Sequence, residues 1–459
     1  MKKVLILSFF AALLIGCTQT GKTNYALLSG KITEPNSEKL NILNDSGKVQ
    51  REIAVNEDGT FSDTIFNVDG YYTLSDGKES TTLYLKNGYN LTMILDTKEF
   101  DETLVYAGEG AEANNYLAQK FLANEKVTGN FQELYGLDEE QFIEKISSFY
   151  ADLEGKLQKL PKSFAEGEKK NLQYGKANML ANYERSHGYA VKDNTFKVSA
   201  DFPDPYENIP LNDEEEYKKN KNYRSLIQNV FFAKMSKQVQ ESKNKISFVK
   251  SISDGLNEMP IGNIREGIAK EISYLLSSGD ADNEALYKSI MESTSDEEFK
   301  EKVTSRMGKL RVLVKGADSP VFVNYENYDG GTTSLTDLRG KFVYIDVWAT
   351  WCGPCRAEIP PFKELVNKYK GKNITFVSIS IDAESDKETW RKMVKEEEID
   401  WIQLFGEADW NSSFAKDYAV NSIPRFIFID PEGKIVESDA PRPSQTEEIE
   451  KLFSESGVK

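Results

Sequence analysis

The pattern of apolar and polar positions divides the chain into three parts. In residues 25–107, short runs rich in β-branched and aromatic residues alternate with polar turns, and the runs at 81–85 and 91–95 suit β-strands. Pairs such as Asn87-Gly88 mark the turns between the runs. This alternation predicts a small antiparallel β-sandwich or barrel.

Residues 108–311 change to helical spacing. Asp138 and Gln141 have the spacing of a helix-capping pair and stand directly before a set of apolar positions three or four residues apart. Two such sets occur: Phe142, Ile146, Phe149, Leu153, Leu157 and Leu160, and later Ile264, Ile268, Ile272 and Leu276. The pattern predicts a domain of amphipathic helices, interrupted by a proline-rich loop at 202–210.

A boundary follows at 316–320, where Gly-Ala-Asp-Ser-Pro interrupts regular structure. Beyond it, strand and helix patterns alternate, with strands expected at 342–348, 374–381 and 426–429 and helices expected at 361–369 and 387–398. This alternation predicts an α/β domain with a central sheet over residues 316–459. The whole chain is therefore expected to be multi-domain.

Charge argues against two classes of partner. The 459 residues carry a formal net charge of −17, from 74 acidic and 57 basic side chains. Nucleic acids and anionic lipid surfaces are negatively charged and bind basic proteins. We therefore expect no nucleic-acid partner, and anionic lipid surfaces are equally poor candidates.

The first residues have the layout of a signal peptide. Lys2 and Lys3 precede an apolar run at 4–15, which is too short to span a bilayer, and Gly16 follows. The sequence Leu-Ile-Gly-Cys that ends at Cys17 resembles the lipobox of bacterial lipoproteins, in which the signal is cut before the cysteine and the sulfur takes a diacylglycerol. The resemblance implies a signal peptide at 1–16, a lipid anchor on Cys17 and a tether at 17–24.

This anchor implies a place in the cell envelope. Thr18 stands where an aspartate typically retains lipoproteins at the inner membrane, so attachment to the outer membrane, facing the periplasm, is expected. The alternative is an ordinary secretory signal with a chance cysteine.

The two remaining cysteines, Cys352 and Cys355, are the candidate chemical centre. They lie in the sequence Trp351-Cys-Gly353-Pro354-Cys, which follows a buried strand and opens a helix. Unpaired backbone N–H groups and the dipole at a helix start stabilise a thiolate. Cys352 is therefore the predicted nucleophile, and Cys355, one turn later, is predicted to resolve the mixed disulfide.

Two alternatives for this pair are weaker. A structural zinc site needs about four ligands, and the chain has no second cysteine pair and a single histidine, His187, far upstream. A purely structural disulfide would close a loop too short to restrict the unfolded chain much. We therefore expect no metal and no cofactor other than a redox-active disulfide.

Residues 316–459 resemble the thioredoxin-fold domain of the TlpA/ResA thiol-disulfide oxidoreductases, within the AhpC/TSA and thioredoxin superfamily. The signature runs over 342–360, after a short hairpin that ends at 338–341. The layout of residues 25–107 also resembles the N-terminal β domain of lipid-anchored members from Bacteroidetes. The resemblance implies a membrane-anchored, periplasmic thiol-disulfide oxidoreductase.

The resemblance also implies roles for further residues. Asp346, six positions before Cys352, corresponds to a buried acid that helps to deprotonate the second cysteine, although an ordinary strand acid facing water is the alternative. Pro424 corresponds to a cis-proline that faces the cysteines. Ile423 would then offer its backbone to an extended substrate.

Other positions are expected at the substrate side of the site. Glu358 occupies the acid of the CxxCxxExP pattern, with a solvated helix acid as the alternative. Trp351 is expected to cover the cysteines, with core packing as the alternative. Gly353 and Pro354 lie between the cysteines. Arg425 replaces the small or hydroxyl residue often found after the cis-proline and is expected to favour acidic or thiolate-bearing partners.

The direction of the reaction is expected to be reduction. A Gly-Pro pair between the cysteines, and Ile423 before the proline, are typical of thioredoxin. By family analogy, disulfide-bearing envelope proteins would be the substrates and a membrane protein of the DsbD or CcdA kind the electron donor. The alternatives are an oxidase or isomerase, a thiol peroxidase resembling AhpC/TSA proteins, and an envelope binding protein with a redox-sensing domain.

Overall fold

The computed structural model describes residues 23–45, 47–193, 195–277, 280–406 and 409–459. The predicted signal peptide, the anchor Cys17 and most of the predicted tether lie outside the described residues. The chain divides into two compact units, each described below by itself. The first contains the described residues up to Leu211 together with Lys219–Leu226, and the second contains Asn212–Lys218 and Ile227–Lys459.

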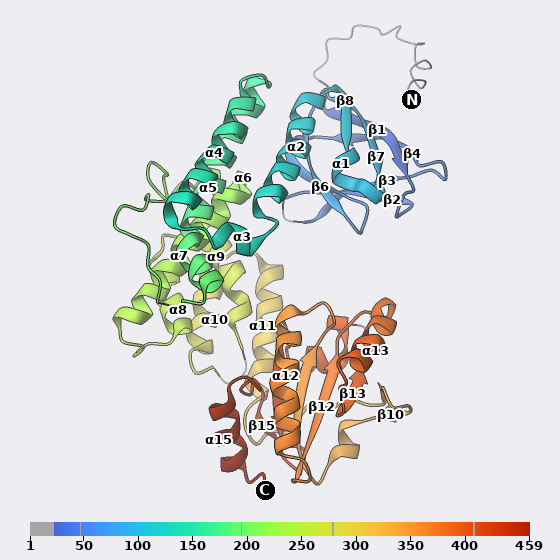
Figure 1. Ribbon diagram of the computed structural model, residues 1–459, viewed down its shortest axis with the longest axis vertical. Helices are drawn as coiled ribbons and strands as arrows, with labels where there is room; N and C mark the ends of the chain where they lie inside the picture. The colour runs from blue at the N-terminus through green and yellow to red at the C-terminus, as the bar shows by residue number, and fades with distance from the viewer. Residues whose placement is uncertain (1–22, 46, 194, 278–279, 407–408) are drawn as a thin grey trace. The chain divides into compact units, whose positions relative to one another are not determined.

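Two four-stranded sheets form the beginning of the first unit (Figure 1). One has the order β4-β1-β7-β8 and the other the order β3-β2-β5-β6. The strands are β1 (Tyr25–Thr33), β2 (Lys39–Leu43), β3 (Val49–Ala54), β4 (Thr60–Phe66), β5 (Asp69–Ser75), β6 (Ser80–Lys86), β7 (Asn90–Asp96) and β8 (Val105–Glu109). Strands β1 and β7 pair in parallel, so the prediction of antiparallel strands is wrong for this pair.

One hydrophobic core takes side chains from both sheets. Strand β7 shows the alternation that places them there, because Leu91, Met93 and Leu95 are buried while Thr92 and Ile94 are exposed. The cluster includes Ala26, Leu28, Leu40, Ile42, Phe61, Leu74, Leu83 and Leu85. The two sheets therefore face a shared interior.

Helices follow the sheets in the first unit. They are η1 (Thr97–Glu99), α1 (Phe100–Thr103), α2 (Ala111–Thr128), α3 (Phe131–Tyr135), α4 (Glu139–Leu157) and α5 (Lys162–Val191). Asp138 caps α4 as predicted, because its carboxylate accepts the backbone N–H of Gln141 at 2.9 Å. The predicted apolar stripe supplies four buried side chains of this helix, namely Phe142, Ile146, Leu153 and Leu157.

The remaining helices before the C-terminal sheet belong mainly to the second unit. They are α6 (Glu214–Lys219), α7 (Lys221–Glu241), whose first residues belong to the first unit, α8 (Phe248–Glu258), α9 (Asn263–Ile272), η2 (Ser273–Leu275), α10 (Asn283–Ser293) and α11 (Glu297–Val312). Ile264, Ile268, Ile272 and Leu276 are all buried, as the predicted stripe requires. The helical part of the chain is thus shared between the two units.

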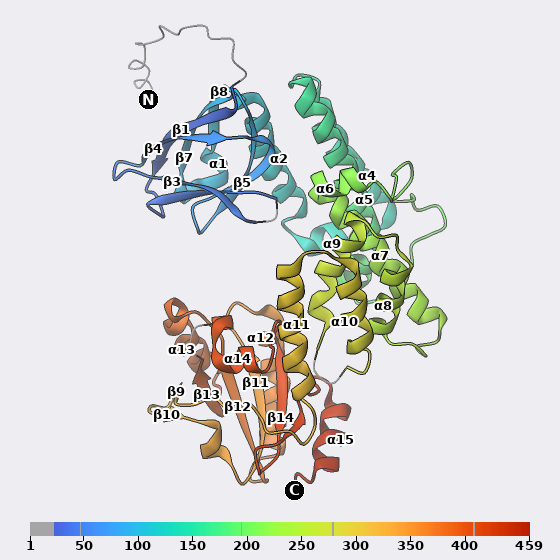
Figure 2. The same ribbon diagram turned by 180° about the vertical axis from the view of Figure 1, so that it is seen from behind.

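A seven-stranded sheet forms the C-terminal part, with the order β10-β9-β13-β12-β11-β14-β15 (Figure 2). The strands are β9 (Tyr325–Asn327), β10 (Thr332–Thr333), β11 (Phe342–Trp348), β12 (Ile374–Ser380), β13 (Ile402–Phe405), β14 (Arg425–Ile429) and β15 (Ile435–Glu437). Strand β11 pairs in parallel with β12 and antiparallel with β14. The predicted strand at 342–348 is confirmed.

Helices cover this sheet on both faces. They are η3 (Leu335–Leu338), α12 (Gly353–Lys368), η4 (Glu384–Asp386), α13 (Lys387–Glu396), η5 (Asp409–Asn411), α14 (Ser413–Asp417) and α15 (Thr446–Ser456). Phe362 of α12 and Phe453 of α15 share one core with Tyr344 of β11, so these two helices pack on the same face. Helix α14 lies on the opposite face (Figure 2). The predicted α/β domain is confirmed.

Within the described residues, no helix combines the length and the apolar character that crossing a bilayer requires.

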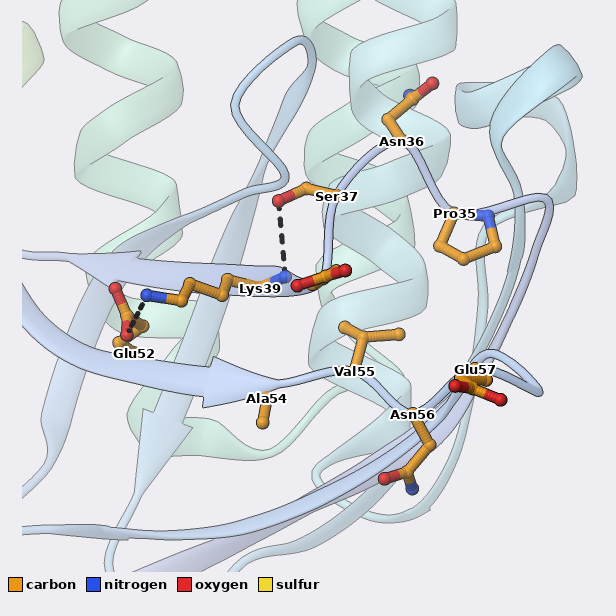
Figure 3. A pocket seen from close by; sticks show the side chains of 10 residues that line it. Pro35, Asn36, Ser37, Lys39, Glu52, Ala54, Val55, Asn56 and Glu57 are labelled. Carbon is orange, nitrogen blue, oxygen red and sulfur yellow. Dashed lines mark hydrogen bonds and ion pairs between the residues drawn. The ribbon is translucent and has the colours of Figure 1, made fainter.

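A hollow of about 540 Å3 lies in the first unit, beside the facing ends of β2 and β3. Figure 3 shows the residues that line it, at positions 35–39, 52 and 54–57. The ammonium of Lys39 and the carboxylate of Glu52 are paired there at 2.8 Å, and both side chains are more than half exposed. The hollow holds no cysteine and belongs to a different unit from the dithiol.

Candidate active site

The cysteine pair lies where β11 ends and α12 begins. Cys352 is the N-cap residue of α12, with an extended backbone, and Pro354 lies in the first helical turn. The sulfur of Cys352 accepts the backbone N–H of Cys355 at 3.1 Å. The two cysteines form a disulfide with a Cα–Cα distance of 5.3 Å. Once this bond is reduced, the N–H groups of the helix start are positioned to stabilise a Cys352 thiolate.

Burial restricts access to the disulfide. Cys352 and Cys355 are 5% and 4% exposed, whereas Gly353 and Pro354 between them are exposed. Between the two buried cysteines, the exposed surface is therefore the Gly-Pro turn. No group of three or more His, Cys, Asp or Glu side chains that could hold a metal ion occurs in the part of the chain that the structure describes.

Asp346 is a partly buried acid on the face of β11 that α12 covers. Its carboxylate accepts a hydrogen bond from the Ser378 hydroxyl at 3.0 Å. Burial raises the pKa of Asp346 to about 7, the Ser378 hydrogen bond opposes that rise, and the negative charge of Glu358 adds to it. A carboxylate with a pKa near neutral is suited to accept and return a proton at physiological pH.

Glu358 is buried in the second turn of α12. Its carboxylate accepts the backbone N–H of Ser444 at 3.0 Å and the Ser444 hydroxyl at 2.7 Å. It is therefore not a solvated helix acid, and its charge is felt at Asp346. The predicted contact of Glu358 with substrate stays a prediction.

The loop before β14 carries the predicted proline. The peptide bond between Ile423 and Pro424 is cis, and both residues are partly exposed. Arg425 is different, because only 6% of its side chain is exposed and its guanidinium pairs with Asp439 at 3.1 Å. The guanidinium is thus largely buried against an acid of the chain itself, and the expectation that Arg425 favours acidic or thiolate-bearing partners stays a prediction.

Two tryptophans, one exposed and one half-buried, form an aromatic pair next to the disulfide. Trp351 is 57% exposed, and its ring lies 6.2 Å from that of Trp410 in η5. Trp348, in contrast, is buried in the core. Sequence reasoning missed Trp410, which is 58 positions beyond Cys352 and follows no motif. A partly exposed aromatic pair of this kind is typical of protein-binding surfaces.

Asp382 is the second residue that sequence reasoning missed. It is completely buried two residues after the end of β12. Its carboxylate accepts the backbone N–H of Thr350 at 3.0 Å, the Thr350 hydroxyl at 2.7 Å and the Ser380 hydroxyl at 2.8 Å. Thr350 lies two residues before Cys352. Asp382 therefore fixes the connection between β11 and α12. An acid that directly follows a buried apolar strand was the available signal.

We expect Asp382→Ala to lower the free energy of unfolding by about 2–4 kcal/mol, because the buried N–H of Thr350 would lose its acceptor. Urea denaturation of the full chain measures this loss. Asp329→Ala, which removes an exposed acid, is the matched control and is expected to change stability by less than about 0.5 kcal/mol. Equal stability of the two variants would contradict the anchoring role of Asp382.

Comparison with known proteins agrees with this geometry. Residues 314–453 match the Redoxin family. The chain is 35% identical to the thiol-disulfide oxidoreductase ResA of Oceanobacillus iheyensis over 114 residues, which are 24% of this chain and 56% of that protein. This chain therefore spans little more than half the length of that relative.

Two further relatives are matched by this chain over a larger share of their own length. The solved thioredoxin domain of a thiol-disulfide oxidoreductase from Bacteroides vulgatus is 27% identical, with a TM-score of 0.28, over 31% of this chain and 99% of that one. ResA of Bacillus cereus is 33% identical over 122 residues, which are 27% of this chain and 67% of that protein. Through its C-terminal part, this chain belongs to the thiol-disulfide oxidoreductases, a family of enzymes with a thioredoxin fold.

Proposed function

We propose that this protein is a disulfide reductase that acts through Cys352 and Cys355. The observation that carries the proposal is the position of the pair at the start of α12, with Asp346 on the covered face of β11 at a pKa of about 7. A nucleophile at a helix N-terminus and a nearby proton acceptor are the two groups that thiol-disulfide exchange requires.

The reaction begins with the reduced dithiol. The Cys352 thiolate attacks one sulfur of a substrate disulfide, a mixed disulfide forms, and the other substrate sulfur leaves as a thiolate that takes a proton. Cys355 then gives its proton to Asp346 and attacks the sulfur of Cys352. The second substrate thiolate leaves, so the substrate has gained two electrons and the enzyme disulfide has formed.

Regeneration requires two electrons from another dithiol. We place this donor in the membrane, by analogy with the DsbD or CcdA kind of protein, and the substrates among disulfide-bearing proteins of the cell envelope. The lipobox-like sequence at Cys17 supports a lipid anchor facing the periplasm. The shared core of the two N-terminal sheets supports a sandwich-like domain that follows the anchor in the sequence.

The reduction potential of the Cys352–Cys355 pair tests the direction of the reaction. Equilibration of the protein without its signal peptide against glutathione or dithiothreitol buffers measures it. We expect a value near about −270 mV, as in thioredoxin. A value near about −120 mV would assign the protein to the oxidases or isomerases instead.

A further inference from the structure

A row of polar side chains crosses the C-terminal sheet on the face that α12 covers. Asp346 of β11 and Ser378 of β12 are register partners, so their side chains project from the same face. Trp401, which directly precedes β13, also lies on this face and packs edge-on against Phe362 of α12 at 4.7 Å between ring centroids. The row therefore lies beneath the helix that begins at the dithiol.

The hydrogen bonds in this row have a fixed direction. The indole N–H of Trp401 donates to the Ser378 hydroxyl oxygen at 2.9 Å, and an indole nitrogen can only donate. The hydroxyl hydrogen of Ser378 is therefore left to donate to Asp346, at 3.0 Å. Ser378 is 1% exposed and Trp401 is 9% exposed, so both groups are largely shielded from water.

We propose that Ser378 and Trp401 are positioning residues that set the proton affinity of Asp346 and, through it, the pH at which Cys355 is deprotonated. The part about Cys355 rests on the proposed reductase function, whereas the part about Asp346 does not. A hydroxyl that donates to a carboxylate stabilises its charged form. Trp401 keeps the hydroxyl in that orientation.

The other groups around Asp346 do not supply such a donor. Glu358, from α12, raises the pKa of Asp346 through its charge. Tyr344, on the same strand, donates its hydroxyl hydrogen to the carbonyl of Pro441. Phe426, the register partner on β14, is apolar. The two cysteines titrate only after the disulfide is reduced. Ser378 is therefore the neighbour that favours the ionised carboxylate.

The direct test follows the Asp346 carboxyl by NMR in the oxidised full chain labelled with 13C-aspartate, with Asp346→Asn used for assignment. We expect Ser378→Ala to raise the titration midpoint by about one pH unit, because the donor is removed. Trp401→Phe frees the hydroxyl to rotate and is expected to raise the midpoint by less. Ser378→Thr keeps a hydroxyl and is expected to restore the wild-type midpoint.

Trp390→Phe is the matched control. Trp390 is fully buried, and its indole N–H has no hydrogen-bond partner among the described residues, so this variant makes the same change of side chain without breaking a hydrogen bond. It is expected to leave the midpoint unchanged. If Ser378→Ala and Trp401→Phe leave the titration midpoint of Asp346 unchanged, as Trp390→Phe does, Ser378 and Trp401 do not set the proton affinity of Asp346.

The pH profile of disulfide reduction is the second readout. The acid limb of the profile is expected to shift to higher pH, further in Ser378→Ala than in Trp401→Phe. At a fixed pH below the midpoint, the rate is then expected to fall by up to about tenfold. If the wild-type protein reduces no disulfide, the proposed function is wrong, and the NMR midpoints still test the roles of Ser378 and Trp401. If the protein reduces disulfides but the midpoints do not change in the variants, only the proposed roles of Ser378 and Trp401 are wrong.

Discussion

Cys352→Ser is expected to abolish disulfide reduction, with a loss of at least roughly a thousandfold in the rate, because Cys352 is the thiol at the N-cap of α12 and Cys355 lies inside the helix. A serine hydroxyl is far less nucleophilic than a thiolate at neutral pH, and the helix N-terminus cannot compensate for that difference. The effect is measured as the rate at which the protein reduces the disulfides of insulin or of a disulfide-linked peptide, with dithiothreitol as the electron donor.

Two companion variants make this result specific. Cys355→Ser keeps the nucleophile and removes the resolving thiol, so it is expected to accumulate a mixed disulfide with the substrate, visible on a non-reducing gel. Cys17→Ser removes the one cysteine outside the pair and is expected to leave reduction in solution unchanged. Reduction that survives in Cys352→Ser would indicate a different nucleophile, whereas a wild-type protein that reduces no disulfide would favour a binding protein.

Asp346→Asn is expected to stabilise the folded protein above pH 7. In the unfolded chain this acid titrates near 3.8, and in the folded protein burial raises its pKa to about 7. Between about pH 4 and 7 the folded state therefore keeps a proton that the unfolded state has lost, and stability falls as pH rises through this window. Asparagine does not ionise, so that loss disappears.

The expected gain is on the order of 2–4 kcal/mol at pH 8 and close to zero at pH 4. Urea denaturation at the two pH values measures it, and Asp400→Asn, which changes an exposed acid, is the control. An equal effect of both substitutions at pH 8 would contradict the raised pKa of Asp346.

The same Asp346→Asn variant is expected to be a poorer enzyme. Without a proton acceptor, deprotonation of Cys355 would slow by roughly a hundredfold near pH 7, within the range of general-base effects. The mixed disulfide should then persist, as in Cys355→Ser but for a limited time. Stopped reactions separated under non-reducing conditions follow its decay. A variant that is both more stable and slower would show that the buried acid serves the chemistry and not the fold.

Local patterns were sufficient for the elements that carry the dithiol. The strand at 342–348 and the apolar stripes of α4 and α9 follow from the spacing of residues close together in the chain. The position of Cys352 at a helix start follows from the strand before it and the Gly-Pro pair after it. These features depend on neighbouring residues, and hydrophobic periodicity reports that local order directly.

Tertiary structure alone decided which distant groups meet. The parallel pairing of β1 with β7 joins strands more than 50 residues apart, and no local pattern specifies a partner. The contacts of Asp382 with Thr350, and of Ser378 with Asp346 and Trp401, depend on the register of β11, β12 and β13. Burial likewise directed Arg425 inward to Asp439. Sequence by itself determined the position of the cysteine pair at the start of a helix. Sheet register and burial determined which groups surround Asp346 and Thr350, because those interactions act between residues that only folding brings together.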